Sequence, residues 1–462
     1  MASTSYWDHI PDDLALLILL HSSPIDIVSL RLVSKRFWTL SRDFILWRAV
    51  YKQSPLLLPK LPIQELLVHE IDQLLCRSQR FHNCWDYPIC HPKTIHRLTC
   101  PVTIIQHTKI ALHRYLFLAQ HSRFWIYDLA LHSESPTISY EDESLDIPWG
   151  INGSSYQCSE VYENGSWGLY IVRTTIRVPE DDQITIYRCF PSEPDQQISK
   201  LSLIIPAVGP MGIRLITLRD EFIVYIHPNK AGRFIYNLRT QEHHFIETRL
   251  PVDSSFVQDI NAVSSSTHIV LILGDQDHNK TSFEAYPLKD LSEPSELPLQ
   301  PSHYGNTDFL CPPGVLVHER STSGSSYPNA LEILSIGSSP PTASLLIMRL
   351  HLLPGGRIIE SLEDLDISDG SNAWQFISHC FIHSSGKGVS RSIGLPVISR
   401  VTGQPYLQGY QIRRKEDGRL SLQICKFLLG DLDYDSQVYA FDGFAGRICL
   451  RSDTDILVLE YT

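Results

Sequence analysis

The 462-residue chain carries a net charge of −12, and 43% of its residues are hydrophobic while 19% are charged. This composition is typical of a globular protein rather than a disordered one, and the length suits two or three domains. The negative charge argues against binding to a nucleic-acid backbone or to an anionic membrane surface as the main activity.

Signals for secretion or membrane insertion are not evident. The opening segment has no basic residues ahead of its first apolar run, and no stretch reaches the ~18 apolar residues of a membrane span. We therefore expect a cytoplasmic and/or nuclear protein. The ten cysteines are scattered and should be reduced thiols, mostly buried.

Residues 10–51 predict a small group of helices. Leu14, Leu17 and Ile18 recur at helical spacing after Pro11, and acidic residues occupy the first turn, where negative charge suits the helix dipole. A second helix should start at Ser23, which can act as the N-cap for Pro24 and the residues after it.

A break between two further helices is expected at Ser34, and the segment closes near Trp47. A module of about 40 residues buries too little surface to be stable alone, yet this one has more apolar residues than its helices can cover. The surplus indicates a partner, and the alternative is a helical cap on the rest of the chain.

This stretch resembles the F-box family. Ile10-Pro11 matches the family's Leu-Pro opening, and Leu14 and Ile18 match its first-helix apolar pair. Ser34 and Phe37 fit the pattern of the middle helices, together with the apolar residues around them. Asp43 and Leu46-Trp47 match the closing Asp-x-x-Leu-Trp segment. Ile10 in place of Leu, and Ile25 where a polar loop residue is common, are small departures.

The resemblance implies binding to a SKP-family adaptor and, through it, to a cullin–RING ligase. The residues that it assigns to adaptor docking are Ile10, Pro11, Leu14, Ile18, Ile27, Leu30, Val33, Trp38 and Trp47. As a whole the chain also resembles fungal F-box proteins with a C-terminal propeller-like domain.

Between residues 53 and 94 we expect a linker with one amphipathic helix. The helix should begin near Ile63, with Leu67, Ile71 and Leu75 on its apolar stripe. Its apolar face should pack on the domain that follows.

Beyond residue 95 the sequence becomes a series of short β-rich runs separated by turn residues, such as residues 115–119, 222–226 and 269–273. An aromatic-rich strand ending in a Tyr-Asp/Asn-Leu unit recurs at 127–129 and 236–238, with a weaker copy at 286–288. We interpret this unit as the inner half of a propeller blade. A terminal hairpin over 438–461 should close the propeller. About six to eight blades would fit, and a large sandwich or two smaller β domains are the alternatives.

A cluster of histidines and cysteines lies at residues 82–100, but its spacing matches no zinc site. We interpret its members as buried thiols and loop histidines, and expect no metal, no cofactor and no catalytic residue.

The sequence thus predicts an α+β protein with an F-box helical domain over 5–52, a linker over 53–94 and a β-rich, propeller-like domain over 95–462. The leading hypothesis is a non-catalytic substrate receptor of an SCF-type ubiquitin ligase, which binds an unknown protein substrate through its β domain. The alternatives are an adaptor-bound scaffold acting outside the ligase, and a propeller-based enzyme or ligand-binding protein.

Overall fold

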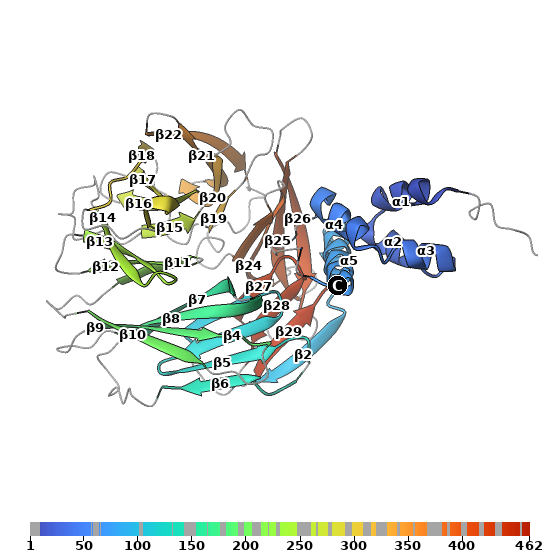
Figure 1. The fold of residues 1–462 in the computed structure, drawn as a ribbon, viewed down its shortest axis with the longest axis horizontal. Helices are drawn as coiled ribbons and strands as arrows, with labels where there is room; N and C mark the ends of the chain where they lie inside the picture. The colour runs from blue at the N-terminus through green and yellow to red at the C-terminus, as the bar shows by residue number, and fades with distance from the viewer. Residues whose placement is uncertain are drawn as a thin grey trace, which may run out of the picture. The chain divides into compact units, whose positions relative to one another are not determined.

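In the computed structural model the chain forms two compact units. Figure 1 shows its helices and strands, coloured from the N-terminus to the C-terminus. The first unit comprises residues 1–95, 381–450 and 458–462, and the second comprises residues 96–380 and 451–457. The residues that the structure describes are 10–56, 58, 64, 66–100, 105–131, 133–142, 154–163, 165–175, 182–192, 198–205, 214–219, 221–227, 232–246, 260–264, 267–275, 280–291, 298–307, 316–319, 330–339, 342–353, 356–366, 381–385, 389–398, 404–414, 420–429, 437–452 and 455–462.

The described residues of the first unit include five α-helices. They are α1 (Asp12–Leu20), α2 (Pro24–Leu30), α3 (Lys35–Leu40), α4 (Phe44–Gln53) and α5 (Val68–Cys84). The side chains of Ser23, Ser34 and Asp43 cap α2, α3 and α4 by accepting a hydrogen bond from a backbone N–H in the first turn. The helix starts expected at Ser23 and after Ser34 are therefore confirmed. The linker helix expected from Ile63 begins at Val68. Among the described helices, none has both the length and the apolar character that a membrane span requires.

The strands of the second unit follow one another in chain order. They are β3 (His107–Ala111), β4 (Tyr115–Gln120), β5 (Arg123–Asp128), β6 (Ile138–Glu141), β7 (Ser154–Glu163), β8 (Ser166–Thr175), β9 (Asp182–Cys189), β10 (Ser199–Ile205), β11 (Arg214–Arg219), β12 (Phe222–His227), β13 (Gly232–Asn237), β14 (Glu242–Ile246), β15 (Ile260–Ser264), β16 (His268–Asp275), β17 (Lys280–Pro287), β18 (His303–Thr307), β19 (Leu316–Glu319), β20 (Ala330–Ser339), β21 (Thr342–Leu353) and β22 (Arg357–Asp366). A short 3-10 helix, η3 (Leu288–Leu291), follows β17.

The first unit contains β1 (Ile89–Cys90), β23 (Phe381–Ser385), β24 (Val389–Ile398), β25 (Pro405–Arg414), β26 (Leu420–Leu428) and β27 (Gln437–Asp442). The strands β2 (Thr94–Thr99), β28 (Arg447–Arg451) and β29 (Asp455–Glu460) have residues in both units.

The strands form repeated four-stranded antiparallel meanders. The groups β3–β6, β7–β10, β11–β14, β15–β18, β19–β22 and β23–β26 each pair in chain order, and β27, β28 and β29 are completed by β2. In the second unit the first strands of successive groups contact one another: β3 with β7, β7 with β11, β11 with β15, and β15 with β19. Within the second unit, the described strands thus form five meanders in the order typical of successive β-propeller blades, and a parallel pairing of β18 with β22 joins the last two into one eight-stranded sheet. The expected α+β fold, with short N-terminal helices before a large all-β part, is confirmed.

The terminal hairpin that the sequence predicted is present as β28 and β29. The last strand, β29, pairs with β28 on one side and with β2, which enters from the start of the β-rich region, on the other. Pairing of the two chain-distant strands satisfies backbone groups that would otherwise form an open edge.

The Tyr-Asp/Asn-Leu unit marks the third strand of a meander. In the copies at Leu129, Leu238 and Leu288, the leucine N–H donates to the backbone carbonyl just before the second strand, that of Arg114, Glu221 or Thr267. Because it is the first strands that contact one another from group to group, the unit lies in the outer half of its blade. The interpretation as the inner half was wrong: a local repeat shows that strands recur, but not which strand of four it marks.

The apolar clusters of the second unit each join two successive groups of strands. One apolar cluster joins β3–β6 to β7–β10, a second joins β7–β10 to β11–β14, and a third joins β11–β14 to β15–β18. Strands covered on both faces need continuous apolar runs, which explains sequences such as Tyr115–Ala119, in which every residue is buried.

Candidate functional site

The four short helices at the N-terminus enclose a filled apolar core. Ala15, Leu19, Ile27, Phe37 and Trp47 are buried in it and pack with residues of α5. The indole N–H of Trp47 donates to the backbone carbonyl of Ser41 at 2.6 Å, which satisfies the polar atom of the largest core side chain. These residues account for the apolar core of the N-terminal helices.

The same helices nevertheless present large apolar side chains to solvent. On α1, Leu14, Leu17 and Ile18 are 52%, 51% and 42% exposed, and their i, i+3, i+4 spacing places them on one face. We call the whole group the exposed apolar set; it consists of Leu14, Leu17, Ile18, Leu32, Val33, Trp38 and Ile45. An apolar helix face exposed in this way, such as that of α1, is typical of a protein-binding site.

Polar contacts hold the segments that carry this set. The guanidinium of Arg36 on α3 bonds to the Asp12 carboxylate at 2.8 Å and to the backbone carbonyl of Ile10, and so joins α3 to the start of α1. Arg42 lies over the ring of Trp38, 3.8 Å from its centroid. The cation–π contact orients an indole that is 45% exposed. These contacts of Arg36 and Arg42 thus help to fix the positions of the segments that carry the exposed apolar set.

The nine residues that the family resemblance assigns to docking differ in how exposed they are in the structure. Five of them are exposed: Pro11, Leu14, Ile18, Val33 and Trp38. Ile10 and Leu30 are partly buried and pack against the helical core. Ile27 and Trp47 are 0% exposed, so direct contact of these two with a partner is corrected to a role in holding the helices together.

The docking residues assigned from the sequence do not include three members of the exposed apolar set, Leu17, Leu32 and Ile45. The helical spacing of Leu17 with Leu14 was a signal that could have identified it. Leu32 is 92% exposed in the turn between α2 and α3, and no periodic pattern marks such a position.

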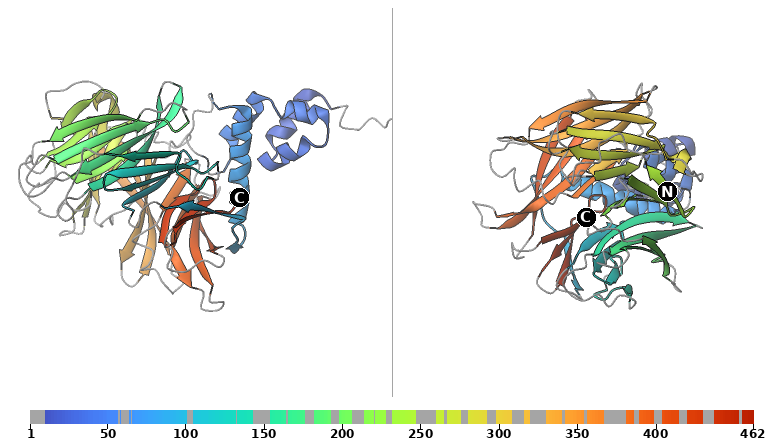
Figure 2. Two further views of the ribbon diagram at one scale, coloured as in Figure 1. Left: turned by 90° about the horizontal axis from the view of Figure 1, so that it is seen from below. Right: turned by 90° about the vertical axis from the view of Figure 1, so that its left-hand side faces the viewer.

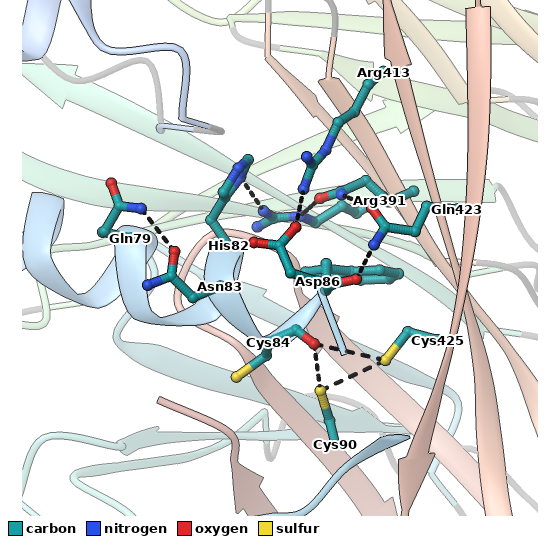
Figure 3. Close-up of polar contacts among 12 residues, drawn as sticks. Gln79, His82, Asn83, Cys84, Asp86, Cys90, Arg391, Arg413, Gln423 and Cys425 are labelled. Atoms are coloured by element: carbon teal, nitrogen blue, oxygen red, sulfur yellow. Dashed lines mark hydrogen bonds and ion pairs between the residues drawn. The ribbon is translucent and has the colours of Figure 1, made fainter. Parts of the chain in front are cut away.

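A second group of contacts lies where α5 meets the strands of the first unit (Figure 3). The rings of Phe81 and Trp85 lie 5.9 Å and 5.0 Å from the ring of Phe427 on β26. The hydroxyl of Ser78 donates to the carbonyl of Phe444 at 3.4 Å. The amide of Gln423 donates to the backbone carbonyl of Trp85. The helix is therefore held on the strands by both apolar and directional contacts.

A buried guanidinium lies at the centre of this group. Arg391 on β24 is 1% exposed, and its hydrogen bonds go to the side-chain oxygen of Gln411 (2.8 Å), the carbonyl of Gly443 (2.9 Å) and the Nδ1 of His82 (3.1 Å). Burial lowers the pKa of Arg391 to about 9, and the neighbouring Arg413 cation acts in the same direction. Burial, followed by the Arg391 cation, lowers the pKa of His82 to about 4. His82 is thus neutral at pH 7 and can accept the bond from Arg391.

The cysteines of this region also lie together. The thiol of Cys90 lies 2.8 Å from the backbone carbonyl of Cys84 and 3.5 Å from the sulfur of Cys425 (Figure 3). A hydrogen bond with Cys425 is the main cause that raises the pKa of Cys90 to about 12, so this thiol is protonated and inert at neutral pH. Within the part of the chain that is described, no group of three His, Cys, Asp or Glu side chains is placed to hold a metal. His82 lies on α5, not in the loop that the sequence suggested.

Comparison with known families identifies the N-terminal helices. Residues 7–53 match the F-box-like family model, so the chain carries an F-box-like domain at its N-terminus. One curated relative, F-box/WD repeat-containing protein A of Dictyostelium discoideum, is 37% identical over 67 residues, which is 14% of this chain and 5% of that protein. The similarity is therefore confined to a short part of the relative.

Solved structures similar to this chain are distant in sequence. The extracellular domains of Drosophila Semaphorin 1b cover 81% of this chain and 88% of their own, with a TM-score of 0.45 and 7% identity. The WD40 domain of SCAP from fission yeast covers 77% of this chain and 84% of its own, with a TM-score of 0.41 and 8% identity. The assignment of the fold accordingly depends on the strand pairing of this chain itself.

Proposed function

We propose that this protein is the substrate-recognition subunit of an SCF-type cullin–RING ubiquitin ligase. In this proposal α1–α4 bind a SKP-family adaptor, which connects the chain to the cullin–RING ligase, while the β-propeller binds a protein substrate. The chain performs no bond chemistry. It accelerates ubiquitin transfer by holding substrate lysines near the charged enzyme. This role places the protein in the cytoplasm and/or the nucleus.

The observation that carries the proposal is the exposed apolar set within the F-box-like segment. Its side chains are exposed, and none of them is among the residues that form or pack against the helical core. Burying one such side chain against a partner contributes about 1.5–3 kcal/mol. A few of them are enough for a stable interface with an apolar adaptor surface.

Binding of the full chain to purified adaptor tests the proposal. Leu17→Asp places a charge on the α1 face, and we expect the dissociation constant to rise by roughly tenfold or more, because each 1.4 kcal/mol is a factor of about ten. The matched control is Leu131→Asp, which changes a leucine that is 62% exposed in the second unit. Equal affinity of both variants and the unaltered chain would refute docking through α1.

Recruitment of the cullin separates the receptor from the scaffold hypothesis. The full chain, with adaptor present, should retain the cullin–RING complex in a pull-down, and the Leu17→Asp variant should lose it. Retention of the adaptor without the cullin would instead identify a scaffold that acts outside the ligase.

A further inference from the structure

The helix α5 belongs to two cores at once. Ile71 and Leu75 in its first half lie in the core of the N-terminal helices. Phe81 in its last turn, and Trp85 directly after it, pack on Phe427 of β26. Figures 1 and 2 both show this helix running from the short helices to the strands of the first unit. Because α5 is one uninterrupted helix of 17 residues, its orientation on the strands decides where the exposed apolar set points.

The apolar contacts of α5 are close but not directional. A Cβ atom built on Gly409 would lie 2.7 Å from the ring of Trp85, and one built on Gly446 would lie 2.5 Å from the ring of Phe81. These glycines let the backbone of β25 and of the turn before β28 approach the aromatic side chains. Apolar burial alone, however, depends on contact area and tolerates rotation or sliding of the helix.

Arg391 supplies the directional contact. Its guanidinium lies 4.9 Å from the ring centroid of Phe81 and 5.6 Å from that of Trp85, and it also bonds to His82. The remaining two bonds go to Gln411 on β25 and to the carbonyl of Gly443 after β27. A planar group with fixed donor directions on β24 that bonds to α5, to β25 and to the turn after β27 favours one arrangement of these segments.

Burying a cation on neutral acceptors is costly, and an apolar side chain would fill the same space without that cost. The described hydrogen bonds of Arg391 all go to neutral atoms. A group of this kind contributes specificity of arrangement more than stability. We propose that Arg391 is a positioning residue, which sets the orientation of α5 on β23–β28 and so the direction in which the adaptor-docking helices are presented. The effect on adaptor presentation rests on the proposed function, whereas the role of Arg391 in orienting α5 does not depend on it.

The test compares full-length variants assembled with adaptor, cullin–RING complex and ubiquitin-charged enzyme. Arg391→Lys keeps the charge but loses the planar fork, and His82→Ala removes only the bond on the α5 side. We expect adaptor affinity within twofold of the unaltered chain. Amide hydrogen exchange should rise tenfold or more in residues 78–86 but not in 12–53. The pattern of ubiquitin conjugated to the chain's own lysines, read by mass spectrometry, should shift severalfold between sites.

Gln79→Ala is the matched control, because Gln79 bonds to Asn83 on the same helix at 2.8 Å (Figure 3). It should leave exchange and conjugation unchanged. Unaltered exchange at 78–86 together with an unaltered lysine pattern in a folded Arg391→Lys or His82→Ala protein would overturn the proposal. So would an equal loss of protection in both segments, since that marks a purely structural role.

The two proposals fail separately in this design. If the unaltered chain does not bind the adaptor, the proposed function fails, and the exchange data alone still decide whether Arg391 orients α5. If an Arg391 variant does not fold, His82→Ala decides the question, because it leaves the bonds of Arg391 to Gln411 and Gly443 in place.

Discussion

Arg31 on α2 forms an ion pair with Asp72 on α5, with the guanidinium and carboxylate 2.8 Å apart and both side chains largely covered. Arg31 also bonds to the hydroxyl of Ser41 at 2.9 Å and lies over the ring of Trp47. This contact connects the short helices of the F-box-like domain to the helix that continues into the strands. It adds a polar contact to the apolar core that the short helices and α5 share.

Removal of one partner from this pair should destabilise the first unit. For Asp72→Ala we expect the free energy of unfolding to fall by about 1–3 kcal/mol, because Arg31 is left partly buried without its counter-charge. Chemical denaturation followed by tryptophan fluorescence measures the change. The double variant Arg31→Met/Asp72→Ala should be no less stable than Asp72→Ala alone, and additive losses would contradict coupling between the two side chains.

Substitution of a buried docking candidate should lower stability, whereas substitution of an exposed one should weaken adaptor binding. Trp47→Ala should lower the free energy of unfolding by about 3–5 kcal/mol through the cavity that it creates. Val33→Ala changes an exposed residue and should leave the melting temperature unchanged while weakening adaptor binding several-fold. Thermal melting and titration with adaptor check both. A loss of stability in Val33→Ala would show that this side chain serves the core.

Substitution of two glycines with positive φ should distinguish the cost of backbone strain from the cost of steric overlap. Gly446 has φ +70° and its added Cβ would lie 2.5 Å from the ring of Phe81, whereas Gly165 has φ +85° with no atom within 4 Å of the added Cβ. Gly165→Ala should cost about 1–2 kcal/mol from conformation alone. Gly446→Ala should cost clearly more, because Phe81 cannot yield without moving α5. Equal costs in denaturation experiments would contradict this close fit.

The second unit contains a buried carboxylate on which three groups converge. Asp142 accepts from the hydroxyl of Tyr187 at 2.8 Å and from Lys200 at 2.7 Å, and it lies 3.7 Å from the fully buried guanidinium of Arg173. Asp142→Ala should lower stability by about 3–5 kcal/mol, since two cations lose a buried partner. Glu141→Ala, at the exposed neighbouring position, is the control and should cost about 1 kcal/mol or less. Comparable losses in a thermal-shift assay would rule out a structural role for the Asp142 cluster.

Stability should decrease in mild acid because two partly buried histidines are neutral in the folded chain. Burial lowers the pKa of His82 and of His107 to about 4 from the ordinary value of 6.5. Between these values the unfolded chain binds protons that the folded chain does not. The stabilisation is therefore complete above pH 6.5 and is lost as the pH falls toward 4. The melting temperature should follow this course, and His82→Gln should reduce its slope. A slope equal to that of the unaltered chain would exclude His82 as a contributor.

Local signals explain which parts of the fold were predictable. A cap such as Ser23 or Ser34 acts within one turn of helix, so the starts of α2 and α3 could be read directly. Strand runs and the Tyr-Asp/Asn-Leu unit likewise depend on neighbouring residues. The three-part division at residues 52 and 94 stays a prediction. Residues 381–450 belong to the same compact unit as the helices, a grouping that no local pattern indicates.

The candidate site was predictable only in outline. Spacing identified the F-box-like segment and its apolar residues, because helical periodicity is a property of the chain itself. Whether a given apolar side chain is covered depends on what packs against it. Ile27 and Trp47 are covered by other helices, whereas Leu17 and Leu32 are not.

By itself, then, the sequence determined that short capped helices of the F-box type precede a long series of antiparallel strands. Only the tertiary structure decided which apolar residues face solvent, that β2 pairs with β29, and that Arg391 lies against Phe81, Trp85 and His82. The reason is physical. Backbone conformation is set largely by interactions between near neighbours, whereas burial and the pairing of a charged side chain are set by segments that meet only after the whole chain has folded.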